Sequence, residues 1–305
     1  MARTFRFSAA LAIAATAACN SEPTGAILDT PHAAGAAIGG GSSGGRIVVT
    51  ESDITRQAEN TPPTDNWVYY FRSPTSTGAF VTGPGNPPLG VGSFLMNTPT
   101  TADKGTLFNF DHIGTRLADI TEISYATYRD PSSLATSPSI QLPSINIQID
   151  PDGAGPLTFA TLVYEPVYNV AADAIETGVW QTWNAESGIW WTTRPINGPD
   201  GPGTCLPTVC YISWDDIVRY NPDAVILGGF GVNQGSGSGG LVAATDALTI
   251  GYDGTTWTYD FEPFRGPASK DDCKDGGWKN LRDENGEPFK NQGQCVSYAN
   301  RASRE

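Results

Sequence analysis

The sequence is poor in histidine and in basic residues. It has 2 histidines, and its 18 lysines and arginines stand against 32 aspartates and glutamates, for a net charge of −14 over 305 residues. So few histidines leave little general-base chemistry, and no G-x-S-x-G motif supplies a nucleophile. Nucleic acids and anionic lipid headgroups are bound through basic surfaces. The composition therefore excludes nucleic acid as an expected partner.

Long apolar runs and helical periodicity are also scarce. No segment has the roughly 18 consecutive apolar residues of a transmembrane helix. One short helix is expected in SWDDIVRYNPD at 213–223, where Ser213 can cap the first turn and Pro222 ends it. We therefore expect a fold built from strands, and any membrane attachment to come from a lipid anchor alone.

What the chain does contain is a series of short β-type runs between residues 46 and 264. β-Branched and aromatic residues alternate with polar ones in segments bounded by Gly, Pro, Asn and Asp, which is typical of strands. Representative runs are RIVVT (46–50), WVYYF (67–71), ITEISYATY (120–128), INIQI (145–149) and TWTYDF (256–261). The pattern predicts an all-β domain, a two-sheet antiparallel sandwich of the jelly-roll or concanavalin-like type with one short helix.

Residues 1–18 have the layout of a bacterial export signal, in which basic residues precede a short apolar stretch that ends in small residues. Cys19 follows and resembles the lipidated cysteine of bacterial lipoproteins, although Thr16 stands where that pattern usually has leucine. The rest of 19–45 is rich in Gly, Ala and Ser and is expected to be a flexible tether. We expect an exported protein held at the cell envelope by a lipid on Cys19, or a secreted protein if the signal is an ordinary cleaved one.

Residues 265–305 differ from the rest of the chain in charge. They hold 8 of the 18 basic residues and 7 of the 32 acidic ones, and Cys273 and Cys295 bracket a segment with few apolar residues. A disulfide across this span would contribute about 3 kcal/mol by reducing the entropy of the unfolded chain, enough to hold a small C-terminal element. The alternative is a disordered tail with two free thiols.

Cys205 and Cys210 lie in a Pro-rich loop, GPGTCLPTVC. With Cys19 set aside, four cysteines remain in an exported protein, and local pairing predicts Cys205–Cys210 beside the tail disulfide. Zinc is the competing interpretation, but His32 and His112 do not have a ligand-like spacing with these cysteines.

Five further segments are long and distinctive: ADITEISYATYRD, TLVYEPVYN, GVWQTWN, SWDDIVRYNPDAVILGGFGVNQGSG and DALTIGYDG. Together they resemble a family of exported bacterial β-sandwich proteins. The tail DDCKDGGWKNLRDENGEPFKNQGQCVSYANR resembles a two-cysteine element found at the end of many such proteins. The resemblance covers nearly everything after Arg46 and implies a β-sandwich and export. The family has no assigned activity, so the resemblance implies no function.

Four of the eight tryptophans lie in GVWQTWNAESGIWWTTR, residues 178–194. If AESG forms a hairpin loop, strand alternation puts Trp183 beside Trp190 on one face, flanked by Gln181 and Arg194. A sugar ring stacks on flat indoles while amide and guanidinium groups bind its hydroxyls. These four residues are therefore the candidate ligand-binding surface.

The opposite face of this predicted hairpin carries Trp180 and Trp191 and is expected to be core. The alternative is that both tryptophan pairs are packing residues, because large aromatic side chains in β-proteins are mostly buried. A change of one residue in loop length would exchange the two faces.

Carboxylates at strand positions form no recognisable catalytic signature; they are Glu165, Asp246, Asp260 and Glu262, with Glu186 in the tryptophan loop. The DPDG turn at 150–153 offers Asp150 and Asp152 to calcium, but two carboxylates are too few for that ion, and a turn accounts for them equally well. We predict no catalytic residue, no metal site and no cofactor, with a structural calcium ion as the alternative.

The favoured function is an extracellular or cell-envelope binding protein that recognises carbohydrate or another surface component. The alternatives are a polysaccharide-degrading hydrolase or lyase on the same scaffold, and a purely structural envelope protein. A binder should expose aromatic side chains, whereas a glycosidase should hold two facing carboxylates within about 10 Å in a groove.

Overall fold

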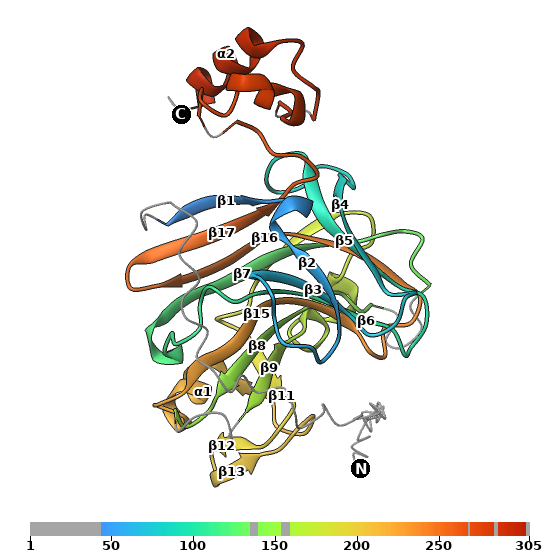
Figure 1. Ribbon diagram of the computed structural model, residues 1–305. Helices are drawn as coiled ribbons and strands as arrows, with labels where there is room; N and C mark the ends of the chain where they lie inside the picture. Colours follow the sequence, from blue (N-terminus) through green and yellow to red (C-terminus); the bar gives the residue numbers. More distant parts are fainter. Residues whose placement is uncertain (1–43, 135–139, 154–158, 268, 284–285, 303–305) are drawn as a thin grey trace, which may run out of the picture.

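The computed structural model describes residues 44–134, 140–153, 159–267, 269–283 and 286–302 (Figure 1). Strands are the main regular structure, as predicted. The helices are α1 (Trp214–Tyr220), α2 (Gln292–Ala302) and five short 3-10 helices at Glu51–Asp53, Leu117–Asp119, Pro166–Tyr168, Ala172–Ala174 and Lys274–Asn280. None of the helices in the described ranges is long and apolar enough to cross a membrane. The predicted export signal, Cys19 and nearly all of the tether lie outside the described residues.

The first large sheet has seven strands. They are β1 (Gly45–Val49), β17 (Thr255–Phe261), β16 (Leu241–Tyr252), β5 (Gly92–Thr98), β4 (Thr77–Thr82), β7 (Ile120–Arg129) and β10 (Trp180–Asn184). β16 is the central strand. Along one edge it pairs first with β5 and then with β17, and along the other edge with β7, which carries β10.

The second large sheet has eight strands in a single path. In spatial order they are β14 (Ile212–Ser213), β11 (Ile189–Thr192), β9 (Ala160–Tyr164), β8 (Ser144–Asp150), β15 (Val225–Gly235), β6 (Lys104–Asn109), β3 (Trp67–Phe71) and β2 (Thr55–Ala58). A separate two-stranded ribbon, β12 (Ile196–Gly198) and β13 (Gly201–Cys205), lies beyond β11 in Figure 1.

The two sheets face each other and share one hydrophobic core. Trp67 of β3 packs edge-on against Tyr259 and Phe261 of β17, with ring centroids 4.9 and 5.8 Å apart. Tyr69 of β3 meets Phe94 of β5 in the same way at 5.4 Å. Alternation along each strand sends these aromatic side chains inward, and their burial provides most of the driving force for folding.

The prediction of purely antiparallel sheets is wrong, because β1 pairs parallel to β17 and β2 pairs parallel to β3. Both parallel strands come from the first part of the described chain, and both lie at the edge of their sheet. Alternation within a strand identifies its buried face but carries no information on the direction of its neighbour, so the sequence pattern could not show this.

Helix α1 forms as the sequence predicts. The hydroxyl of Ser213 accepts a hydrogen bond from the backbone N–H of Asp216 at 3.2 Å, which caps the first turn. Trp214 and Ile217 are the buried residues of the helix, and they join the core.

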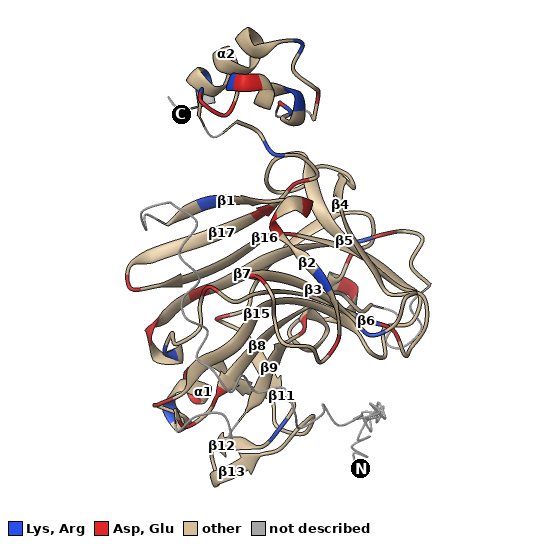
Figure 2. Cartoon of the chain, in the orientation of Figure 1, with Lys and Arg blue, Asp and Glu red and all other residues tan. Residues whose placement is uncertain are grey.

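The C-terminal element has its own small core and stands beyond β1 and β17 in Figure 1. The Cys273–Cys295 disulfide is present, as is the Cys205–Cys210 disulfide, so both predicted pairs are confirmed. Phe289 packs beside the tail disulfide. Helix α2 was not predicted, since only one helix was expected. Figure 2 shows basic and acidic residues mixed along the chain of this element, whereas acidic residues outnumber basic ones in the rest of the described chain.

Candidate functional site

The predicted tryptophan surface is not exposed. Trp183 is 7% exposed and Trp190 is fully buried, and both belong to the core between the sheets. Each indole N–H is satisfied there, because Trp183 donates to the Thr127 hydroxyl at 2.8 Å and Trp190 donates to the carbonyl of Ala185 at 2.9 Å. The prediction that these two indoles face solvent is therefore wrong.

The physical reason is that β10 and β11 do not form a hairpin. β10 pairs with β7 in the first sheet, and β11 pairs with β9 and β14 in the second. The loop between them passes from one sheet to the other, so the inward faces of both strands meet in the core. The expected faces are exchanged, and Trp180 and Trp191, which were predicted to be core, are the half-buried pair.

Gln181 and Arg194 do not lie beside the buried indoles as ligand-binding groups. The Gln181 amide accepts from the backbone N–H of Glu176 at 2.8 Å and donates to the carbonyl of Ala174 at 2.7 Å, which fixes the loop before β10. The guanidinium of Arg194 stacks over the ring of Phe159 at 5.1 Å. The structure therefore does not bring the four predicted residues together as one site.

A different group of side chains gathers on the outer face of the second sheet. Because Trp190 of β11 points inward, the next residue, Trp191, points outward. The pairing of Trp190 with Ile212 places Tyr211 opposite Trp191 across the strands. The pairing of Trp191 with Val163 places Glu165, at the end of β9, diagonally beside Trp191 on the same face.

Hydrogen bonds of the Asn169 side chain place Tyr168 on this face. Pro166 begins a single 3-10 turn immediately after Glu165, and Asn169 follows the turn. The Asn169 amide donates to the carbonyls of Glu165 and Ile189 at 2.9 and 3.1 Å and accepts from the N–H of Ile189 at 2.7 Å. These bonds replace strand pairing where β9 ends, and they fix the turn that carries Tyr168.

We refer to Glu165, Tyr168, Trp191 and Tyr211, which form two interacting pairs on this face, as the aromatic site. Trp191 donates its indole N–H to the Glu165 carboxylate at 2.8 Å. The Tyr168 and Tyr211 rings lie 5.1 Å apart. Tyr168 is 41% exposed and Tyr211 is 36% exposed. The site therefore presents aromatic rings to solvent next to a carboxylate.

The electrostatics of the aromatic site are dominated by Glu165. Burial raises the pKa of this carboxyl, and the hydrogen bond from Trp191 only partly opposes the shift. Burial also raises the pKa of Tyr168 and of Tyr211, and the negative charge of Glu165 adds to both shifts. Both phenols therefore stay neutral, and Glu165 is the ionisable group of the site that can carry a negative charge.

Exposed apolar side chains extend the aromatic site along the Cys205–Cys210 loop. Of the ten exposed large hydrophobic residues among those described, five belong to this region: Tyr168, Ile189, Leu206, Val209 and Tyr211. The disulfide and a hydrogen bond from the Cys210 N–H to the carbonyl of Leu206 close the loop directly before Tyr211. An exposed apolar patch of this kind marks a binding surface more often than the scattered apolar residues of an ordinary surface do.

A second cluster, formed by Asp246, Asp260 and Glu262, lies on the outer face of the first sheet. Glu262 accepts from the N–H groups of Val91 and Gly92 at 2.8 and 3.1 Å. Burial raises the pKa of Asp246 and of Glu262 to about 7. We refer to these three residues as the carboxylate cluster.

The carboxylate cluster is covered by the connection between β4 and β5. Asp246 accepts from the N–H of Leu89 in this loop at 3.0 Å, and Trp180 donates to the carbonyl of Pro84 at 2.8 Å. Gly90 has a φ of +55°, and a Cβ there would lie 1.6 Å from a Glu262 oxygen, so only glycine fits. The loop thus packs closely against the carboxylates, which are almost completely buried.

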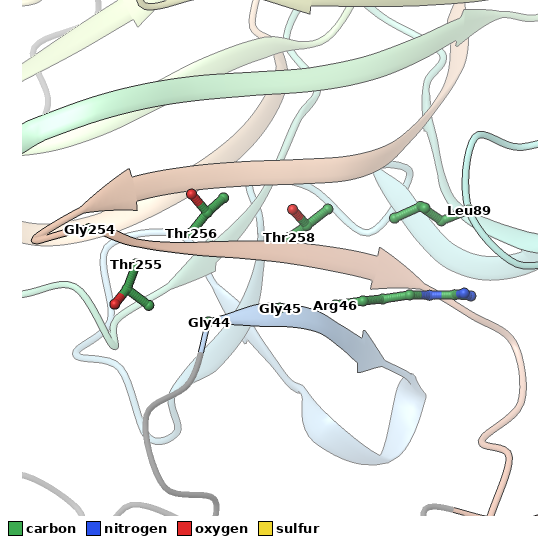
Figure 3. A pocket seen from close by; sticks show the side chains of 8 residues that line it. All are labelled: Gly44, Gly45, Arg46, Leu89, Gly254, Thr255, Thr256 and Thr258. Carbon is green, nitrogen blue, oxygen red and sulfur yellow. The ribbon is translucent and has the colours of Figure 1, made fainter. Parts of the chain in front are cut away.

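A groove of about 670 Å³ runs along β1 beside the carboxylate cluster (Figure 3). Its lining residues are Gly44, Gly45, Arg46, Leu89, Gly254, Thr255, Thr256 and Thr258. Arg46 closes the end of the groove toward the cluster and pairs with Asp260 at 2.7 Å. No carboxylate of the cluster lines the groove, so the groove as it stands offers hydroxyl groups and one guanidinium.

No metal centre is seen in the described ranges, where no three His, Cys, Asp or Glu side chains could hold an ion. In the DPDG segment, the N–H of Asp152 donates to the Asp150 carboxylate at 3.3 Å. That bond is the one expected for a turn in which the aspartate side chain accepts from the backbone two residues on.

Sequence reasoning missed Tyr168, Trp191 and Tyr211 as site residues. Glu165 was noted, but only as an isolated strand carboxylate. The available signal was the adjacent pair Trp190 and Trp191, because one of two neighbouring strand residues must point away from the core.

Comparison of the chain with protein-family models, with curated proteins and with solved structures gives no match, so the family resemblance noted in the sequence stays a prediction.

Proposed function

We propose that the protein is an exported carbohydrate-binding protein and that the aromatic site binds the sugar. The observation that carries the proposal is the exposure of Tyr168 and Tyr211 on the same face as the half-buried indole of Trp191, which is hydrogen-bonded to Glu165. Sugar rings have one apolar face that stacks on aromatic rings and a rim of hydroxyls that a carboxylate and phenols can bind. Aromatic residues with a polar tip are also the side chains most favoured at binding surfaces.

Several features support the wider setting of this function. Two disulfides fit an oxidising compartment, as export would provide. The two facing sheets with one core agree with the proposed sandwich of the jelly-roll or concanavalin-like type as scaffold. A lipid on Cys19, with the tether that follows, would hold such a domain at the cell envelope.

A polysaccharide-degrading enzyme remains the second candidate because two members of the carboxylate cluster have pKa values of about 7. Such values suit general acid and base chemistry. However, backbone N–H groups occupy both oxygens of Asp246 and one oxygen of Glu262, and the β4–β5 loop covers these carboxylates. A binding function at the open aromatic site therefore has the better support.

The proposal is tested with a glycan array, followed by titration of the best glycan with the full chain. The Tyr168→Ala/Tyr211→Ala double variant should lose binding while its melting temperature changes little, since both side chains are exposed. Phe264→Ala is the matched control, because it removes another exposed aromatic side chain near the C-terminal element. Wild-type protein that is folded and binds no glycan would contradict the proposal, and so would full binding by the double variant.

A further inference from the structure

Glu165 lacks a cationic partner in the part of the chain that the structure describes. The ion pairs of other glutamates, such as Glu59 with Arg72 and Lys104, have no counterpart here. Among the described residues, Trp191 alone donates a hydrogen bond to its side chain, and the bond reaches one carboxylate oxygen, Oε2. No hydrogen bond from the described residues reaches the other oxygen, Oε1. The site thus holds a largely buried carboxylate that has hydrogen-bonding capacity left on one oxygen.

This combination has a definite ligand preference. Faces of tyrosine and tryptophan rings carry negative potential and attract organic cations, most strongly where water is partly excluded. A desolvated carboxylate without a counter-ion is costly, and an incoming cation removes that cost. The two tyrosines and Trp191 supply the ring faces, and Glu165 supplies the charge.

We infer that the aromatic site selects a sugar that carries a free ammonium group, that is, an amino sugar of the glucosamine type. The inference rests on the carbohydrate-binding function proposed above and names the class of sugar. The ammonium would lie against Glu165 Oε1, and the pyranose ring would stack on Tyr168 or Tyr211. The net charge of −14 draws cationic oligosaccharides toward the protein in general, but only contact at Glu165 would make binding depend on this one residue.

Three tetrasaccharides test the inference directly. All are β-1,4-linked, and they differ only at carbon 2, which carries an ammonium (glucosamine), an acetamide (N-acetylglucosamine) or a hydroxyl (glucose). Titration of the full chain at about pH 6, where most amines of the glucosamine oligomer are protonated, should give about tenfold tighter binding of the glucosamine oligomer than of the glucose oligomer. The acetamide, which is neutral, should show no such preference.

The variant Glu165→Gln separates charge from shape. A glutamine oxygen can still accept from Trp191, so the fold should hold, and the preference for ammonium should fall to within about twofold while binding of the glucose oligomer is kept. Asp215→Asn is the matched control, because it removes the same charge from an exposed position near β14 and should leave the preference unchanged. Added salt should also reduce the preference in wild-type protein, which tests the charge without any variant.

The outcomes distinguish this inference from the function on which it rests. Equal affinity for the three oligomers, or a preference that survives Glu165→Gln, would overturn the inference and leave carbohydrate binding in place. Binding of none of the oligomers and of no array glycan would overturn both. Binding of tetramethylammonium as tightly as the glucosamine oligomer would also overturn the inference, since the sugar ring would then contribute nothing to recognition.

Discussion

The pH dependence of stability should reveal Asp246 as a buried acid that holds its proton. Asp246 is fully buried, and its pKa is about 7 compared with 3.8 for an unperturbed aspartate, chiefly because burial disfavours its charge. A difference of about three pKa units corresponds to about 4 kcal/mol. Since the pKa is raised by folding, the proton stabilises the fold fully below about pH 3.8. This contribution is lost as the pH rises through 7.

The substitution Asp246→Asn removes the titration. Both carboxylate oxygens accept backbone N–H groups, from Leu89 at 3.0 Å and from Phe261 at 3.1 Å. An amide has only one oxygen, so the variant loses one of these bonds and should be less stable than wild type at low pH by about 1 to 3 kcal/mol. Between about pH 4 and pH 8 the difference should move in favour of the variant by about 4 kcal/mol.

Urea unfolding of both proteins across this pH range measures the difference. Every other group titrates in both proteins, so the comparison isolates Asp246 and its effect on Glu262, whose pKa Asp246 helps to raise. The control Asp215→Asn, at an exposed position, should give a constant difference. A difference between wild type and Asp246→Asn that stays within about 1 kcal/mol from pH 4 to pH 8 would refute the assignment of a buried, proton-holding carboxyl.

Three further predictions concern the core, the buried histidine and the loop. Trp190→Ala should lower the unfolding free energy by about 3 to 5 kcal/mol in urea titrations, because the side chain is fully buried, and a loss below about 1 kcal/mol would contradict its place in the core. Burial lowers the pKa of His112 to about 4. As the pH drops from about 6.5 to 4, the unfolding free energy should therefore fall by about 3 kcal/mol more in wild type than in His112→Gln. Unfolding free energies of the two proteins that change in parallel with pH would contradict this. Replacing Cys205 and Cys210 with serine should cost about 2 kcal/mol and weaken glycan binding in titrations, because the loop that presents Tyr211 is released; unchanged affinity would show that the disulfide does not position the site.

Local features of the fold could be predicted from the sequence. The strands follow from alternation, and helix α1 follows from the cap at Ser213 and the stop at Pro222. The disulfides follow from pairing each cysteine with its nearest neighbour in sequence. Each of these inferences depends on residues within about 25 positions of one another, where sequence spacing and spatial distance are closely linked.

Features that depend on the partner of a strand could not be predicted. The segment 178–194 reads as a hairpin because a four-residue turn joins two aromatic strands, yet each strand finds its partner in a different sheet. The glycine-rich run GGFGVNQG belongs to β15. A Cβ at Gly229 would lie 2.3 Å from the Phe108 ring, so glycine there reflects close packing of β15 on β6. Strand partners and close packing of this kind depend on residues far away in the sequence, so the pattern of neighbouring residues does not reveal them.

The contrast between the two groups of carboxylates shows why the aromatic site is the better candidate for function. Asp246 and Glu165 both have pKa values raised by burial, so the shift alone does not separate a structural acid from a binding one. Hydrogen-bond partners do separate them. Asp246 has a backbone donor on each oxygen, Leu89 on one and Phe261 on the other. It lies where the partner of β16 changes from β5 to β17, so its carboxyl accepts from N–H groups that strand pairing leaves free. Glu165 has one donor on one oxygen, and two exposed tyrosines lie on the same face. An acid whose oxygens all accept hydrogen bonds from the protein backbone stabilises the fold. An acid with an oxygen that accepts no such bond, at an exposed aromatic surface, can bind a ligand. For Glu165 we expect that ligand to carry an ammonium group.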